Sequence, residues 1–261
     1  MKQHVMKQNR GQLTENTEPK CRTCRDIGYI FIDETVEDYG YHEYAKICPV
    51  CKAGNPNDQR LKAELPQKFF TTCLPDFKFD SYSGDSEEMK KIAGSFFRDF
   101  DKWRADALGL YLWSSKRGSG KTMLACALSN SLMIKNGISV RFITVPDYLE
   151  SLKRSFNRKP EEPDHSRQYQ ECDLLILDDF GAEKNGAWQD QELFRLIDYR
   201  YTRRLPVIVT ANSPVDQLDC NTRIVDRLYD MTVMIHLPEE GIRAKKADER
   251  KRRFLDSVIS K

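Results

Sequence analysis

One short stretch, from Ser115 to Thr122, limits what this chain can fold into more than any other part of it. It carries two glycines and ends in Lys121 and Thr122, after an apolar run at 108–113 and before a helix-forming run at 123–133. A phosphate-binding loop has a typical context: a buried strand, then a glycine-bearing turn, then Lys-Thr, then a helix. The stretch therefore predicts a nucleotide site between a strand and a helix.

The chemistry of this loop follows from its backbone. Successive N–H groups of a tight turn point at one phosphate, and the helix behind them adds the positive end of its dipole. Lys121 is placed to reach the β- and γ-phosphates, and the Thr122 hydroxyl to bind Mg²⁺. The residues that we expect to contact the nucleotide here are Ser115, Lys116, Arg117, Gly118, Ser119, Gly120, Lys121, Thr122 and Met123.

The loop departs from the usual G-x-x-x-x-G-K-[ST] pattern at one position, where Ser115 replaces the first glycine. That glycine eases the turn out of the strand. Serine fits there without strain if φ is negative, whereas a positive φ costs about 1 kcal/mol. We expect the departure to matter little.

Apolar strands and helices alternate along the rest of the chain. We expect strands at 138–144, 173–179, 206–212 and 232–237, and helices at 86–107, 147–156, 188–204, 222–229 and 247–260. Strands that are apolar throughout and alternate with helices predict an α/β fold, in which a parallel sheet is covered by helices on both faces.

Polar side chains end two of these strands. Asp178 stands 57 residues after Lys121 and is followed by Asp179, in the place of a Walker B motif. There the first carboxylate holds Mg²⁺ and the second polarises the attacking water. Asp179 is one methylene shorter than the glutamate common at this place, so we expect slow intrinsic hydrolysis. Asn212 ends the next apolar strand, at the same sheet edge as the loop, where it can orient the water or the γ-phosphate.

Four of the eight cysteines form two C-x-x-C pairs, Cys21 with Cys24 and Cys48 with Cys51. In a reducing compartment this spacing indicates a zinc ribbon, in which four thiolates close a structural tetrahedral site. The metal then supplies folding energy that so small a module lacks. The alternative is four unrelated thiols. His42 could replace one ligand, although four cysteines make this unnecessary.

Length and composition suit two domains. We expect a disordered tail at 1–20, a zinc-binding domain at 21–60, a linker and packing segment at 61–85 and an ATPase domain at 86–261. No apolar run approaches the roughly 18 residues of a membrane span. The N-terminus lacks the apolar region of a signal peptide, so we expect a cytoplasmic protein without a membrane partner.

The motifs, taken in order, resemble the AAA+ ATPases of the DnaC/DnaI helicase-loader group, with the IstB transposition ATPases as close neighbours. The resemblance rests on residues 118–122, 177–183, 208–212 and 223–228, and it covers roughly residues 65–255. The paired cysteines are similar to the N-terminal zinc module of the DnaI-like branch. An AAA+ P-loop NTPase fold with a small zinc-ribbon-like domain is the expectation.

The resemblance also implies roles for single residues. It makes Asn212 the sensor 1 residue and Arg227 the arginine finger, which reaches the ATP of a neighbouring subunit and so drives self-association. Arg223 is the alternative finger. Arg243, in a short match to the sensor 2 segment, is then a γ-phosphate contact. The implied cofactors are ATP, Mg²⁺ and Zn²⁺, and the implied partners are a hexameric replicative DNA helicase and single-stranded DNA.

Two basic clusters are candidates for contact with DNA. Seven of the eleven residues from Arg243 to Arg253 are Lys or Arg. The second cluster comprises Lys153, Arg154, Arg158 and Lys159. It lies close in sequence to two aromatic residues, Tyr148 and Phe156. Basic side chains with aromatics nearby suit single-stranded nucleic acid, although charge runs are often only solvated faces.

Three functions fit these features. The first is a helicase loader that holds single-stranded DNA, grips the helicase with its zinc module and uses ATP binding and hydrolysis to control assembly and release. The second is an IstB-like transposition accessory ATPase that forms filaments on duplex DNA. The third is an ATP-gated scaffold in which hydrolysis is incidental. The zinc-bearing head favours the first.

Overall fold

The computed structural model describes residues 19–36, 40–52, 54, 58–155, 166–181 and 186–259. Nearly all of the tail expected at 1–20 lies outside these ranges, as do Phe156, Arg158 and Lys159 of the second basic cluster. Within the described ranges, no helix combines the length and apolar character needed to cross a membrane.

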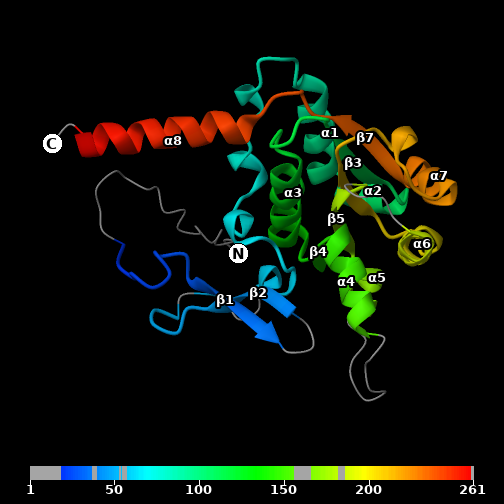
Figure 1. Cartoon of the computed structure of the whole chain (residues 1–261), viewed down its shortest axis with the longest axis horizontal. Coiled ribbons are helices and arrows are strands. Elements are labelled where there is room, and N and C mark those ends of the chain that lie inside the picture. Colours follow the sequence, from blue (N-terminus) through cyan, green and yellow to red (C-terminus); the bar gives the residue numbers. More distant parts are fainter. Residues whose placement is uncertain are drawn as a thin grey trace, which may run out of the picture.

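A five-stranded sheet forms the centre of the protein (Figure 1). Its strands are β3 (Gly109–Trp113), β4 (Val140–Thr144), β5 (Leu174–Phe180), β6 (Val207–Ala211) and β7 (Thr232–His236). They lie in the order β4-β5-β6-β3-β7, and every neighbouring pair is parallel. The predicted parallel sheet is confirmed. Because β6 lies between β3 and β5, the strand ends that carry the P-loop, the two carboxylates and Asn212 meet at one edge.

Helices cover both faces of this sheet, as predicted. They are α1 (Glu87–Arg98), α2 (Phe100–Ala105), α3 (Lys121–Asn136), α4 (Val145–Ser155), α5 (Arg167–Glu171), α6 (Ala187–Thr202), α7 (Thr222–Met231) and α8 (Ile242–Ile259). One buried cluster joins α1 and α3 to the sheet, and a second joins α4, α6 and α7 to the opposite face. Figure 1 shows α3 on one side of the strands and α6 and α7 on the other.

Two helices differ from the sequence-based expectation. The single helix expected at 86–107 is interrupted at Asp99, whose N–H still donates to the Ser95 carbonyl while its own φ and ψ leave the helical region. The interruption lets the rings of Phe100 and Trp103 both pack edge-on against Phe96, at centroid distances of 5.4 and 5.2 Å. The last helix begins at 242 rather than 247, because its first turn is held against the P-loop.

The segment before α1 packs closely against α3. It is built from short 3₁₀ turns at Gln59–Lys62, Gln67–Phe69, Leu74–Asp76 and Phe79–Ser81. The Asn130 amide donates to the carbonyls of Phe69 and Thr72, both at 2.8 Å, and Ser131 Oγ accepts from the Leu74 N–H at 2.9 Å. These buried side-chain bonds fix a segment whose own helices are only three or four residues long.

The cysteine-bearing module is an antiparallel hairpin of β1 (Tyr29–Val36) and β2 (Gly40–Ile47). Its Tyr29 and Phe31 rings both meet Phe70 edge-on, with centroids 5.1 Å apart in each case. Phe70 is buried and belongs to the segment that packs on α3. This aromatic contact connects the hairpin to the sheet domain.

Candidate nucleotide site and metal centre

The P-loop between β3 and α3 takes its shape from two glycines. Gly118 has φ +79° and Gly120 has φ +107°, in the left-handed region that favours glycine. A Cβ on Gly118 would stand 3.0 Å from the Arg243 Cβ, and one on Gly120 would stand 2.8 Å from the Tyr82 hydroxyl. Ser115 is not among the residues with positive φ, so serine fits there without backbone strain, as expected.

Lys121 begins α3, and its ammonium group lies inside the loop. Its Nζ donates to the Ser114 carbonyl at 2.8 Å and to the Lys116 carbonyl at 3.4 Å. The side chain is only 9% exposed. Burial lowers the pKa of Lys121, while nearby carboxylates act in the opposite direction. A cation held by backbone carbonyls can exchange them for phosphate oxygens.

Asp178 lies between two hydroxyl groups. Its Oδ2 accepts from Thr122 Oγ1 at 3.2 Å, and its Oδ1 accepts from Thr210 Oγ1 at 2.7 Å. Burial raises the pKa of Asp178, and the two hydroxyl bonds oppose the rise. The structure thus brings a hydroxyl from α3 and a carboxylate from β5 together, and such oxygens are the ligands that Mg²⁺ prefers. Thr122 and Asp178 therefore fit a magnesium ion.

The end of β5 is irregular where its two carboxylates stand. The pairing with β6 shifts register there, and Asp179 has φ +60°. This bulge leaves Asp178 buried and turns Asp179 to the solvent-exposed side. The Asp179 N–H donates to Thr210 Oγ1 at 3.0 Å, and the Asn212 amide lies 3.5 Å from Asp179 Oδ1. A non-glycine residue at positive φ, directly after a buried carboxylate at a strand end, is the kind of strain that collects at functional sites.

The two predicted arginines lie in different surroundings. The Arg243 N–H donates to the Gly118 carbonyl at 3.1 Å, so α8 begins directly beside the P-loop. Arg227, on α7, donates from Nε to Asp198 Oδ1 at 2.6 Å and stacks 4.7 Å from the centre of the Phe194 ring. Within the described part of the chain, the partners of Arg227 belong to α6 and α7 and not to its own P-loop.

The sequence-based prediction does not include three residues that bond to the loop or to its neighbouring carboxylates. Thr210 is the one polar residue in the apolar strand 207–211, and that contrast was a usable signal. Tyr82 donates to the Ser119 carbonyl, and Glu239 accepts from the loop backbone. Neither Tyr82 nor Glu239 carries a sequence signal, because each reaches the loop only through the tertiary fold.

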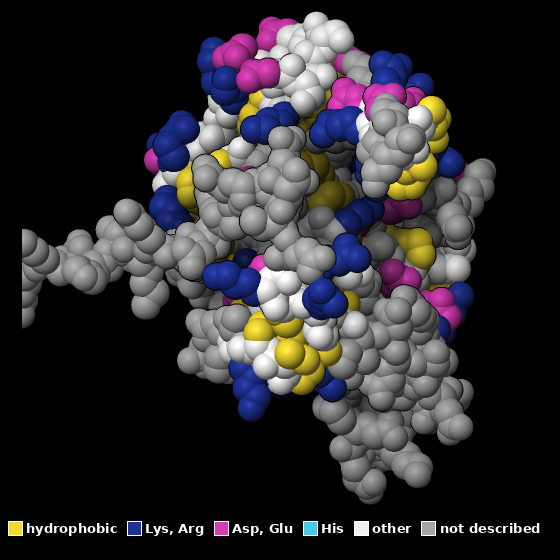
Figure 2. Space-filling model, turned by 90° about the vertical axis from the view of Figure 1, so that its left-hand side faces the viewer, with side chains coloured by type: hydrophobic (Ala, Val, Ile, Leu, Met, Phe, Trp, Pro, Cys, Tyr) yellow, Lys and Arg dark blue, Asp and Glu magenta, His cyan; other side chains and the backbone are white. Residues whose placement is uncertain are grey.

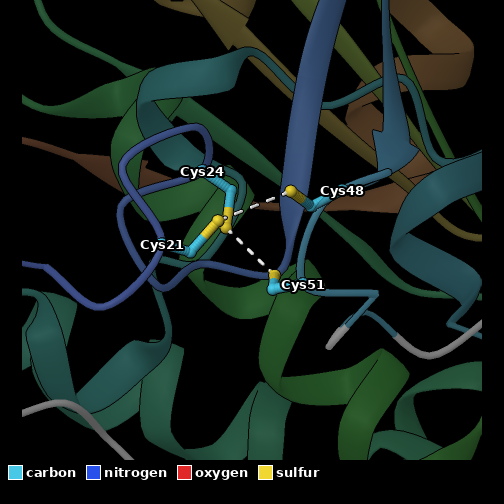
Figure 3. A group of neighbouring side chains, drawn as sticks. All are labelled: Cys21, Cys24, Cys48 and Cys51. Atoms are coloured by element: carbon cyan, nitrogen blue, oxygen red, sulfur yellow. Dashed lines mark hydrogen bonds between the residues drawn. The ribbon is translucent and has the colours of Figure 1, made fainter.

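The four predicted metal ligands converge at the base of the hairpin (Figure 3). All four sulfur atoms lie within 4.8 Å of one another, with Cys21 and Cys48 3.8 Å apart and Cys24 and Cys51 3.5 Å apart. A tetrahedral zinc ion with Zn–S bonds of about 2.3 Å requires sulfurs about 3.8 Å apart. The donor set therefore fits zinc. The side chain of His42 lies outside the described residues.

The basic run predicted for DNA contact lies on α8, which projects away from the sheet domain (Figure 1). Arg250–Arg253 are exposed, and so are apolar residues of the last two turns, including Phe254 and Ile259. Figure 2 views the molecule from the side of this projection and shows Lys and Arg side chains interspersed with hydrophobic ones. In the second cluster, Arg154 pairs with Glu150 on its own helix.

Comparison with known proteins places these features in a family. The model of the family described as IstB-like ATP-binding protein matches residues 58–250. The chain belongs to this family. Its fold matches that of the crystal structure of the DnaC helicase loader, which superposes with a TM-score of 0.56 at 21% identity, covering 66% of this chain and 99% of that one, in agreement with the fold predicted from the sequence.

Two relatives carry names that bear on function. The replicative helicase loader DnaC of Escherichia coli K12 is 26% identical over 156 residues, which are 58% of this chain and 62% of the relative. The replicative helicase loader DnaI of Bacillus subtilis is 32% identical over 111 residues, or 42% of this chain and 35% of that protein. The chain thus spans less than two thirds of the length of either relative.

Proposed function

We propose that this protein is an ATPase that loads a replicative DNA helicase onto single-stranded DNA. The observation that carries the proposal is the contact of Thr122 with Asp178 at the end of β5, beside a glycine-shaped P-loop. The chain's membership of an ATP-binding family and its similarity to two proteins named helicase loaders support it.

The residues of the loop divide the chemistry among them. Lys121 gives up its backbone carbonyls and binds the β- and γ-phosphates, while Thr122 and Asp178 hold Mg²⁺. When bound, Mg²⁺ neutralises charge on the phosphate oxygens. Asp179 polarises the attacking water and Asn212 orients it. Because the Asp179 carboxylate is short and faces solvent, we expect slow hydrolysis by the isolated chain.

Self-association completes the site in this proposal. Arg227 is the arginine finger, and it reaches the nucleotide of the neighbouring subunit. Its pairing with Asp198 supports this role, because it holds the guanidinium against α6 and not at the P-loop of its own chain. Assembly then requires Arg227 to leave Asp198 for the neighbour's phosphate. Arg223, also stacked on Phe194 at 5.2 Å, is the alternative.

The zinc-binding module is the proposed grip on the helicase. Two large apolar side chains stand exposed on its cysteine loops, Ile27 at 46% and Val50 at 68%. They lie on turns that a closed four-cysteine zinc site would hold rigid. Exposed apolar side chains on turns held rigid in this way are suitable anchors for a protein partner.

Single-stranded DNA is the proposed ligand of α8. Its exposed Arg250–Arg253 can neutralise phosphates, and the neighbouring Phe254, at 65% exposure, offers a ring for base stacking. Because such binding releases counterions, it should weaken steeply with added salt. Replacing Phe254 with alanine should weaken binding to a single-stranded oligonucleotide much more than binding to a duplex of equal length.

Co-purification with the replicative helicase of the source cell, with and without ATP, tests the loading function. ATP-dependent capture by the full chain is expected, and capture should be lost on removal of residues 1–60. If the truncated chain captures the helicase as well as the full chain does, the proposed role of the zinc module is refuted. A helicase that never co-purifies would refute the loading function as a whole.

Two variants then separate hydrolysis from binding. Lys121→Ala should abolish nucleotide binding and loading together. Asp179→Ala should bind nucleotide and assemble, yet fail to release the helicase. If Asp179→Ala instead loads and releases the helicase like the wild type, hydrolysis has no role of its own, and the protein is then an ATP-gated scaffold.

A transposition accessory ATPase is the second candidate. The family model that matches most of the chain is the one described as IstB-like. ATP-dependent assembly on long duplex DNA, in preference to single-stranded DNA of the same length, would favour this candidate over the loader. Electron microscopy of the protein with each DNA and ATP distinguishes the two.

A further inference from the structure

The segment 237–241 between β7 and α8 is fixed at one end to the last residue of β3 and, through the start of α8, at the other end to the P-loop. The Leu237 N–H donates to the Trp113 carbonyl at 2.8 Å, at the end of β3. The Arg243 N–H donates to the Gly118 carbonyl at 3.1 Å, in the middle of the loop. A side chain between these two anchors is therefore held at the start of the loop.

Glu239 is that side chain, and it binds the first two residues of the loop. Its Oε1 accepts from the Ser115 N–H at 3.0 Å, and its Oε2 accepts from Ser115 Oγ at 2.6 Å and from the Lys116 N–H at 2.8 Å. His236 Nε2 lies 2.8 Å from Oε1, and the His236 ring stacks on Trp113 at a centroid distance of 4.0 Å. One carboxylate thus gathers four hydrogen bonds from three residues.

The bonds keep this carboxylate ionised. Burial by itself would raise the pKa of Glu239, but the hydrogen bonds from Ser115, His236 and Lys116 outweigh it and lower the pKa to about 2. Hydrogen bonds to an ionised acceptor are about twice as strong as neutral ones. The start of the loop is therefore hydrogen-bonded to a Glu239 carboxylate that is ionised at neutral pH.

This contact explains the serine in place of the first glycine. Glycine would have no Oγ and could not form the 2.6 Å bond to Glu239. We propose that Glu239 is a positioning residue of the nucleotide site, which fixes Ser115 and Lys116 so that the loop is ready for phosphate. The proposal rests on the proposed function, because it assigns Glu239 to the ATP site described above.

The effect of Glu239 reaches the catalytic lysine in one step. The Lys116 N–H is bound by Glu239, and the carbonyl of the same residue accepts from Lys121 Nζ at 3.4 Å. Fixing Lys116 therefore fixes one of the groups that hold the ammonium inside the loop. Loss of Glu239 should let Lys121 move before any phosphate arrives.

Positioning and simple charge predict opposite effects of neutralising Glu239. A negative charge beside the loop repels the nucleotide phosphates, so removing the charge alone would tighten binding. Removing hydrogen bonds that hold the loop in order would weaken nucleotide binding, because part of the binding free energy must then be used to order the loop. The Glu239→Gln variant has nearly the same shape as the native residue and decides between them.

Glu240 provides a matched control. It is the same residue type at the next position, and it also accepts three hydrogen bonds, from the Ser83 N–H at 2.7 Å, Ser83 Oγ at 3.1 Å and the Gly84 N–H at 3.1 Å. These bonds go to the segment before α1 and not to the P-loop. Glu240→Gln therefore removes an equal charge and similar bonds without loosening the loop.

The experiment is titration of the full-length variants with a fluorescent ATP analogue and Mg²⁺. Glu239→Gln should weaken binding about ten-fold, which corresponds to about 1.4 kcal/mol, and Glu240→Gln should bind like the wild type. Ser115→Ala should weaken binding less, and Ser115→Ala added to Glu239→Gln should weaken it no further. Equal or tighter binding by Glu239→Gln would overturn the proposal.

A second measurement does not depend on nucleotide. In hydrogen exchange of the nucleotide-free chain, the amides of Ser115 and Lys116 should exchange faster in Glu239→Gln than in Glu240→Gln, at similar melting temperatures. Unchanged exchange would also overturn the proposal. If neither the wild type nor Lys121→Ala binds the analogue, the proposed ATP site is wrong. The hydrogen-exchange result alone then decides whether Glu239 fixes Ser115 and Lys116.

Discussion

Replacing Thr210 with valine removes one hydroxyl from the centre of the candidate site and keeps the shape of the side chain. That hydroxyl donates to Asp178 Oδ1 at 2.7 Å and accepts from the Asp179 N–H at 3.0 Å. A buried polar group left without a partner costs about 1 to 3 kcal/mol. With two groups affected, we expect Thr210→Val to lose about 3 kcal/mol of unfolding free energy at pH 8. The melting temperature should fall by roughly 6 to 12 °C.

The size of this loss depends on pH through Asp178. Burial raises the pKa of Asp178 above its ordinary value, so the ionised carboxylate opposes folding once pH rises through the folded-state pKa. Valine removes a hydrogen bond that favours the ionised form and raises this pKa further. The stability difference between wild type and variant is therefore largest above the folded-state pKa. It shrinks toward the unfolded-state pKa, below which the carboxyl is protonated in both states.

Urea unfolding of both proteins between pH 8 and pH 4, followed by circular dichroism, checks this reasoning. Thr210→Ser retains the hydroxyl and is the control, with a much smaller loss expected. A Thr210→Val variant as stable as the wild type at pH 8 would refute the reasoning. So would a stability difference that grows as the solution is acidified.

Three further predictions concern other parts of the chain. Cys48→Ser should reduce bound zinc from about one ion per chain to almost none, as measured by metal analysis of the purified protein. Phe70→Ala removes the ring that both Tyr29 and Phe31 contact, so limited proteolysis should release the cysteine-bearing hairpin faster than in the wild type, with ATP binding retained. Arg227→Ala should bind ATP like the wild type. Its ATP hydrolysis rate per chain, however, should no longer rise with protein concentration, as the wild-type rate should when subunits assemble. Loss of that concentration dependence in Arg223→Ala instead would reassign the finger.

The sequence predicted those parts of the site that depend on residues close together in the chain. Gly118 and Gly120 shape the P-loop by their own backbone freedom, and the C-x-x-C spacing places each pair of thiols on one turn. The apolar strands and their polar ends were also readable, because burial on both faces of a parallel sheet leaves a continuous apolar run. Two helix boundaries were wrong. A regular apolar spacing does not reveal the interruption at Asp99, which serves packing against Phe96. The earlier start of α8 at Ile242 depends on its contact with the distant P-loop.

The tertiary structure decided which distant side chains meet. Strand order places β3 between β6 and β7, so Ser115 and Glu239 become partners across 124 residues of sequence. The same fold directs the Thr210 hydroxyl to both carboxylate residues and pairs Arg227 with Asp198. Such hydrogen bonds require the donor and acceptor to be placed to within a few tenths of an ångström and in the right direction. Local propensity does not encode this placement. The sequence alone therefore determined the glycine-shaped turn between β3 and α3, and the packing of remote segments determined what holds that turn in shape.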